Sequence, residues 1–216
     1  VWPDSMRDTL LSSFGDRWTP SEDEADRILA QKDWNPDGSD MKPVKVLRRV
    51  LGFDQRTVHA AVEVVKEDPA LEVLIIHLGG LDNVEHVFWE YRFPEDFKRK
   101  PKQKDIEVLG PVIDRYAEWV DKGIGEIIAA YPEQPDVMVM SDHGMGSFEN
   151  RPPFKGWHVS PGIFVGSGPG FAQDANRKTV SYYDIVPTIL NLQGLVKPEN
   201  LKGQSLAKPA PAIASR

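Results

Sequence analysis

Apolar residues recur at helical spacing in two stretches of the chain. In residues 43–66 the repeating positions are Val44, Leu47, Val50, Leu51, Val58, Ala61, Val62 and Val65. This period places them on one face, so the stretch predicts one long helix, or two helices that meet near residues 52–54. Residues 104–131 repeat the pattern and predict a second amphipathic helix, in which Gly110-Pro111 indicates a kink or a late start.

Two continuous apolar runs follow helical stretches. Residues 71–78 form the first run, and residues 136–140 form the second, which ends in Asp142 and His143. A long helix followed by a short apolar run is typical of an α/β domain, with a mostly parallel sheet flanked by helices. The elements expected after residue 145 are a loop over 146–153, a strand over 161–166 and a helix over 182–192.

Composition narrows the class of protein. The 216 residues carry a net charge of −7 and a pI of about 5.3, which argues against a protein that holds a nucleic-acid duplex through phosphate contacts. The absence of cysteine excludes disulfides, thiolate metal sites and a Cys nucleophile. No apolar run approaches the roughly 20 residues of a membrane span, and residues 1–4 do not resemble a signal peptide. Residues 207–216 alternate Ala, Pro and Ser and predict a loose tail.

Side chains suited to metal binding follow both apolar runs. Asp82 and His86 are four residues apart, so they share one face if their segment is helical. Asp142 and His143 close the second run, and His158 is expected on a loop before the next strand. Because ligand sites of open α/β sheets form beyond the carboxyl ends of the strands, we expect these five side chains to converge.

The types of these side chains indicate divalent metal ions. Carboxylate oxygen and imidazole nitrogen suit zinc, manganese or iron. Five ligands exceed the three of a catalytic zinc and approach the number in a two-metal site, a recurrent device for phosphoryl transfer. The two other histidines, His59 on a helix and His77 at a strand end, are expected to be structural.

Several motifs occur in order along the chain. They are Asp82-x-x-x-His86, Ser141-Asp142-His143-Gly144-Met145, Gly156-Trp157-His158, Pro161-Gly162-Ile163-Phe164-Val165, Gly168-Pro169-Gly170, Tyr183-Asp184-Ile185-Val186-Pro187-Thr188-Ile189-Leu190 and Gly203-Gln204-Ser205-Leu206. Together they resemble the alkaline phosphatase superfamily, and within it the type I phosphodiesterase/nucleotide pyrophosphatase branch. The resemblance is specific over residues 70–206 and looser over residues 1–69.

The resemblance implies two divalent metal ions, zinc in this branch and manganese in the related mutases. Asp82, His86 and His158 would hold one ion, whereas Asp142 and His143 would help to hold the other. A further Asp and a Thr or Ser nucleophile are expected upstream of Val1. No catalytic nucleophile is therefore assigned within the chain.

The resemblance also predicts the domain organisation and one departure from the family. Residues 1–206 would form an alkaline-phosphatase-like catalytic domain that is N-terminally incomplete. Its helical segment would span residues 1–69, and its metal-ligand-bearing α/β part would span residues 70–206. Glu85 precedes His86 where the family often has Gly, which bears on the conformation expected for that loop.

Three side chains beside the ligands are candidates for substrate binding. Trp157 and Trp89 could stack on a base or line an apolar pocket for the leaving group, and Lys155 could meet substrate charge. The alternative roles are packing for the two indoles and ordinary surface charge for the lysine.

The function expected from the resemblance is metal-dependent hydrolysis of a small phosphate ester, either a phosphodiester or a nucleotide pyrophosphate, in the intact parent enzyme; whether this chain is active alone is left open. A hydroxyl would attack phosphorus in line and form a covalent phospho-enzyme. Two alternatives stay open: a phosphomonoesterase, phosphoglycerate mutase or sulfatase of the same fold, and a catalytically inactive metal-binding domain. Substrate identity and oligomeric state are not predicted. The compartment is also open, although the family resemblance favours an extracytoplasmic one.

Overall fold

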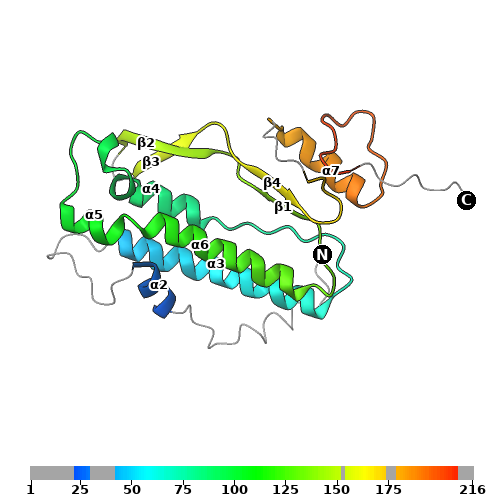
Figure 1. Cartoon of the computed structure of the whole chain (residues 1–216), viewed down its shortest axis with the longest axis horizontal. Coiled ribbons are helices and arrows are strands. Elements are labelled where there is room, and N and C mark those ends of the chain that lie inside the picture. Colours follow the sequence, from blue (N-terminus) through cyan, green and yellow to red (C-terminus); the bar gives the residue numbers. More distant parts are fainter. Residues whose placement is uncertain (1–21, 30–41, 152–153, 174–178, 209–216) are drawn as a thin grey trace, which may run out of the picture. The chain divides into compact units, whose positions relative to one another are not determined.

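The computed structural model describes residues 22–29, 42–151, 154–173 and 179–208 (Figure 1). They form two compact units. The first unit takes the chain up to Pro132 together with His143–Ser160, and the second takes Glu133–Asp142 and the chain from Pro161 onward. The helix start expected at Thr19-Pro20 and residues 209–216 of the expected tail lie outside the described residues.

The first unit is built mainly from helices. They are α2 (Glu22–Leu29), α3 (Lys42–Glu67), α4 (Gly80–Arg92), the 3-10 turn η1 (Pro94–Asp96), α5 (Gln103–Leu109) and α6 (Val112–Ala130). Figure 1 shows α3 and α6 side by side, and both pack against α4. The fully buried residues of their shared core are Leu47, Leu51, Val84, Phe88, Leu109, Val112 and Tyr116. None of the described helices is both long enough and apolar enough to cross a bilayer.

Both helical predictions are confirmed, and the structure decides the alternative that each of them left open. Residues 42–67 form a single helix rather than two, because the buried face continues through Gly52-Phe53-Asp54, where Gly52 and Asp54 are buried and Phe53 is exposed. The stretch over 104–131 is divided at Gly110-Pro111 into α5 and α6. Proline lacks the N–H that would continue the helical ladder, so the break falls where the sequence predicts it.

The predicted strand over residues 71–78 is wrong, because this segment pairs with no strand in the described structure. Its side chains still alternate as in an extended chain. Leu74, Ile76 and Leu78 pack against the small core around Val58, Ala61 and Ile127, whereas the side chain of Ile75 is 79% exposed. Leu74, Ile76 and Leu78 are thus partly buried against helices instead of within a sheet. The two strand pairs among the described residues are both antiparallel, so the predicted mostly parallel sheet is not found there.

A β-hairpin completes the first unit. Strand β2 (Gly144–Arg151) pairs antiparallel with β3 (Phe154–Val159), with Met145 opposite His158 and Gly146 opposite Trp157. The sequence predicted a loop over residues 146–153 and placed His158 on a loop. The loop prediction is wrong for residues 146–151, and the loop placement of His158 is also wrong, while residues 152–153 lie outside the described residues. The prediction rested on the Gly, Asn and Pro content of the stretch. Pairing between the strands and packing of β3 on α4 outweigh that local preference.

The second unit contains the other strand pair and the last helix. Strands β1 (Val137–Met140) and β4 (Phe164–Ser167) are antiparallel, and a 3-10 turn η2 (Tyr182–Asp184) leads into α7 (Ile185–Leu192). The Ser181 hydroxyl and the Asp184 carboxylate cap this turn reciprocally. The expected strands over 136–140 and 161–166 and the helix over 182–192 are therefore confirmed within a few residues. Lys208, at the start of the expected tail, is held by its N–H, which donates to the Gly170 carbonyl.

Two phenylalanines of the first unit give a matched test of this packing. Phe88 is fully buried, whereas Phe53 is 59% exposed. We expect Phe88→Ala to lower the free energy of unfolding by about 3–5 kcal/mol, because it removes a packed ring and leaves a cavity. Phe53→Ala should change it by no more than about 0.5 kcal/mol. Urea denaturation followed by circular dichroism measures both, and equal losses would contradict the assigned core.

Candidate metal centre

Helix α4 presents Asp82 and His86 on one face. The segment is helical, so the spacing of four residues brings Asp82 Oδ1 within 3.5 Å of His86 Nε2. Glu85 lies inside this helix rather than in a loop, and Glu is a better helix former than Gly. The departure from the family pattern at Glu85 therefore fits the local structure.

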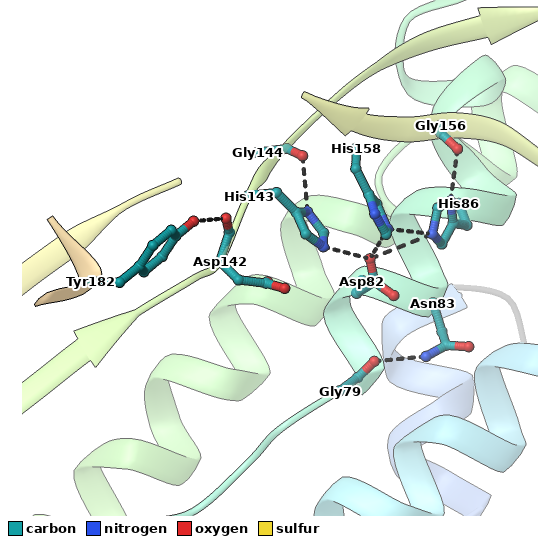
Figure 2. A network of polar contacts seen from close by, with 10 residues as sticks. All are labelled: Gly79, Asp82, Asn83, His86, Asp142, His143, Gly144, Gly156, His158 and Tyr182. Carbon is teal, nitrogen blue, oxygen red and sulfur yellow. Dashed lines mark hydrogen bonds and ion pairs between the residues drawn. The ribbon is translucent and has the colours of Figure 1, made fainter. Parts of the chain in front are cut away.

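The hairpin brings two further histidines to the same place (Figure 2). His158 Nε2, on β3, lies 3.2 Å from Asp82 Oδ1 and 3.0 Å from His86 Nε2. His143, just before β2, places its Nε2 3.8 Å from Asp82 Oδ1, and its ring stacks on that of His158 with centroids 3.6 Å apart. Four of the five side chains that the sequence singled out thus converge in the first unit.

Asp142, the fifth of these residues, belongs to the second unit. Its side chain is exposed, and its carbonyl oxygen accepts a hydrogen bond from the Tyr182 hydroxyl of the same unit. It is joined to His143 by a peptide bond. His143 thus lies with Asp82 and His158 in the first unit, whereas Asp142 is counted with the second.

The imidazole hydrogen bonds fix where the lone pairs point. His86 Nδ1 lies 2.7 Å from the Gly156 carbonyl oxygen, and His143 Nδ1 lies 3.0 Å from the Gly144 carbonyl oxygen. A carbonyl oxygen only accepts, so both Nδ1 atoms carry hydrogen, and the Nε2 atom of each neutral ring bears the lone pair. Both Nε2 atoms face the Asp82 carboxylate (Figure 2). With both rings neutral, their Nε2 lone pairs and the Asp82 carboxylate point at one place, an arrangement that a bound cation would stabilise.

The spacing of the donor atoms fits a divalent metal ion. Two ligands that each lie about 2.0–2.1 Å from a tetrahedral zinc are about 3.3–3.4 Å apart. The separations among Asp82, His86 and His158 are 3.0, 3.2 and 3.5 Å, close to that value. The backbone carbonyl behind His86 is the kind of outer partner that orients a metal-binding imidazole.

Gly156 has a role in this site that the sequence did not reveal, although it belongs to the Gly156-Trp157-His158 motif. A Cβ atom at this position would lie 2.6 Å from the Glu85 carbonyl oxygen, so only glycine allows β3 to come this close to α4. The same approach brings the Gly156 carbonyl to His86. The packing of hairpin on helix and the orientation of the imidazole therefore depend on one glycine.

The three candidate substrate-binding residues have contacts within the first unit. The Trp157 ring lies 5.4 Å from those of His86 and His158, nearly parallel to the latter. Trp89 Nε1 donates to the Ser147 hydroxyl, and Lys155 Nζ lies 3.0 Å from a Glu90 carboxylate oxygen. Trp157 thus lies against the cluster, while Trp89 and Lys155 connect α4 to the hairpin.

The serines beside the ligand segments also have structural partners. Ser147 donates to Asp96 and accepts from Trp89, and the Ser141 hydroxyl accepts from the Ile163 N–H in the second unit. These hydrogen bonds give both hydroxyls a role in holding their own segments.

The nucleophile expected upstream of Val1 stays a prediction. Val1 itself lies outside the described residues. The further Asp that the resemblance implies in the same upstream part is likewise a prediction. No hydroxyl of the described residues is assigned as the nucleophile.

The two remaining histidines lie apart from the cluster. His59 is on α3, and His77 is exposed on the extended segment over residues 71–78. Neither belongs to the group of side chains around Asp82, as the sequence led us to expect.

The sequence profile of the type I phosphodiesterase/nucleotide pyrophosphatase family matches residues 4–181. The chain belongs to this family. The resemblance inferred from the motifs is thereby confirmed, and the match includes most of the stretch over 1–69 in which the motifs were looser. The motifs over residues 183–190 and 203–206 lie beyond the matched part of this phosphodiesterase-family chain.

Curated relatives of this family member include phosphoglycerate mutases. The 2,3-bisphosphoglycerate-independent phosphoglycerate mutase of Ruegeria sp. (strain TM1040) is 34% identical over 96 residues, which cover 41% of this chain and 18% of the mutase. The enzyme of the same name from Chloroflexus aggregans (strain MD-66 / DSM 9485) is 31% identical over 105 residues, which cover 44% of the chain and 19% of the mutase. The chain thus spans less than a fifth of these relatives. No solved structure gives a significant match.

Replacing Gly156 by alanine tests the contact between helix and hairpin. The added Cβ must push β3 away from the Glu85 carbonyl, so we expect Gly156→Ala to weaken zinc binding by about tenfold, as the loss of an outer-shell partner does. Competition with a chromophoric chelator measures this affinity. Gly125→Ala is the control, since nothing lies within 4 Å of the added methyl. Unchanged affinity in Gly156→Ala would contradict the assigned role.

Glu85 gives a pH-dependent prediction. Burial, and then the negative charge of Asp82, raise the pKa of Glu85 from 4.5 to about 7, although His143 acts in the opposite direction. Between these two pKa values the unfolded chain has lost the proton that the folded protein keeps, so stability falls as the pH rises through this window. Glu85→Gln should therefore raise the Tm of chelator-treated protein at pH 8 more than at pH 5.

The control for this prediction is Glu118→Gln, which makes the same change on an exposed position of α6. Its Tm difference from the unmodified protein should be similar at both pH values. An equal gain for Glu85→Gln at pH 5 and pH 8 would be inconsistent with a raised pKa of Glu85.

Proposed function

We propose that the protein is a metal-dependent phosphoryl-transfer enzyme that hydrolyses phosphate esters of the phosphodiester or nucleotide pyrophosphate class. The observation that carries this proposal is the convergence of Asp82, His86 and His158, whose donor atoms all lie within 4.8 Å of one another. Membership of the phosphodiesterase family supports the reaction class.

In this proposal two divalent ions, of zinc or manganese, occupy the site. Asp82, His86 and His158 hold one ion, and His143 with Asp142 contributes to the second. Two such ions would supply activation of an attacking oxygen and stabilisation of the negative charge on the leaving oxygen. The nearness of His143 Nε2 to Asp82, at 3.8 Å, supports two neighbouring sets of ligands.

The charge around the cluster supports a metal requirement for substrate binding. Asp82, Glu85 and Glu90 all lie on α4, and Glu90 is paired with Lys155. A phosphate ester would be repelled by the Asp82 carboxylate unless cations reversed the local field. Trp157, which lies against two of the imidazoles, is proposed to line the substrate's apolar portion. The proposal assigns no nucleophile to the described serines Ser141 and Ser147.

A second candidate function is phosphoglycerate mutation on the same site. It is favoured by the matches to 2,3-bisphosphoglycerate-independent phosphoglycerate mutases. Both reactions transfer a phosphoryl group, and they differ in whether water or a substrate hydroxyl receives it. The residues of the cluster would have the same roles in either reaction.

Metal binding by the full chain is the first test. We expect Asp82→Ala, His86→Ala and His158→Ala each to weaken zinc or manganese binding by tenfold or more, because each removes one ligand of a small set. Isothermal titration of the metal-free protein measures the affinities. His59→Ala, a histidine of α3 outside the cluster, is the matched control. The metal centre is falsified if none of the three variants differs from this control.

Activity assays with the loaded protein then separate the candidate functions. Hydrolysis of bis-p-nitrophenyl phosphate that requires zinc or manganese and is lost in His86→Ala would support the phosphodiesterase. Interconversion of 3- and 2-phosphoglycerate with the same dependence would support the mutase. Metal binding without either reaction would favour either the catalytically inactive metal-binding fragment or an enzyme that uses the nucleophile predicted upstream of Val1.

A further inference from the structure

We propose that Asp54 is a positioning residue of the metal centre, which holds the N-terminus of α4 in place and thereby fixes the helical turn that carries Asp82. This inference rests on the proposed function, because it concerns the ligands of the proposed metal ion.

The Asp54 carboxylate is buried at the junction of three helices. Asp54 lies on α3 and is only 3% exposed. Its Oδ2 accepts hydrogen bonds from the Gly80 N–H of α4, at 3.0 Å, and from the Tyr116 hydroxyl of α6, at 2.9 Å. Burial raises the pKa of Asp54, and these two hydrogen bonds act against that rise. A buried carboxylate is costly unless donors satisfy it, so its presence here calls for a specific role.

That role is to cap α4 from a distance. The N-cap residue of α4 is Gly79, which has no side chain to accept from the exposed N–H groups of the first turn. Asp54, which precedes Gly80 by 26 residues, supplies the missing acceptor. Its carboxylate also lies at the positive end of the helix dipole. The Asn83 side chain donates to the Gly79 carbonyl at 2.8 Å and secures the same turn (Figure 2).

The contact of Gly80 with Asp54 and Tyr116 fixes the position of the N-terminus of α4. A Cβ atom on Gly80 would lie 1.9 Å from the Tyr116 hydroxyl oxygen and 2.4 Å from Asp54 Oδ2, so only glycine allows this approach. Asp82 follows two residues later in the same first turn. Any displacement of Gly80 would therefore change the 3.2 and 3.5 Å separations of Asp82 Oδ1 from His158 and His86.

The experiment compares variants of Asp54 with a variant of its other partner. Asp54→Ala removes the acceptor, and Asp54→Ser keeps a polar atom that is too short to reach Gly80, which covers the case in which the alanine variant does not fold. We expect both to weaken zinc binding by about tenfold and to change the visible absorption spectrum of bound cobalt, which reports ligand geometry. Asp54→Asn retains one oxygen for Gly80 and should restore affinity to within about threefold of the unmodified protein.

Tyr116→Phe is the matched control, because it removes the other hydrogen bond of the same carboxylate and leaves Gly80 bound. It should lower the Tm but keep zinc affinity within about threefold and the cobalt spectrum unchanged. Unmodified affinity and spectrum in the Ala and Ser variants, or the same loss of affinity in Tyr116→Phe, would overturn the inference alone. An unmodified protein that binds no zinc would overturn the proposed function and this inference together.

Discussion

The structure around the candidate metal centre depends on the close approach of strand β3 to helix α4 at Gly156. A glycine is required there because any larger residue would meet the Glu85 carbonyl. The approach aims the Gly156 carbonyl at His86 and carries His158 over the face that bears Asp82. This one contact therefore determines both the packing of β3 on α4 and the arrangement of the candidate metal ligands.

Helix α4 is fixed at both ends around its ligands. At its N-terminus the Gly80 N–H is bound by the buried Asp54 carboxylate. Toward its C-terminus, Trp89 donates to Ser147, and Glu90 pairs with Lys155, which ties the helix to both strands of the hairpin. Rigid elements hold ligand geometry better than loops do, and both candidate ligands of α4 lie between these fixed points.

Local periodicity predicted several of the helices of this structure. It failed for the elements whose conformation depends on contacts between residues far apart in the sequence. The helical period gave α3, α5 and α6, and a spacing of four residues placed Asp82 beside His86. The hairpin was missed because Gly, Asn and Pro usually indicate loops. Here the stretch forms two strands because they pair with each other and β3 packs on α4. The continuous apolar run over residues 71–78 fits a strand and an unpaired extended segment equally. Asp54 gave no signal at all, since its partner Gly80 is 26 residues away.

The sequence separation of the ligands has a consequence for folding. Asp82 and His158 are 76 residues apart, so the cluster forms only after a long loop has closed and the hairpin has docked on α4. Before that step, Asp82 and His86 offer a cation only two ligands on one helix. Any cation that needs the third therefore binds the docked form alone, and by mass action its concentration shifts the docking equilibrium. If the proposed metal binds here, its supply would thus shift the docking of the hairpin on α4.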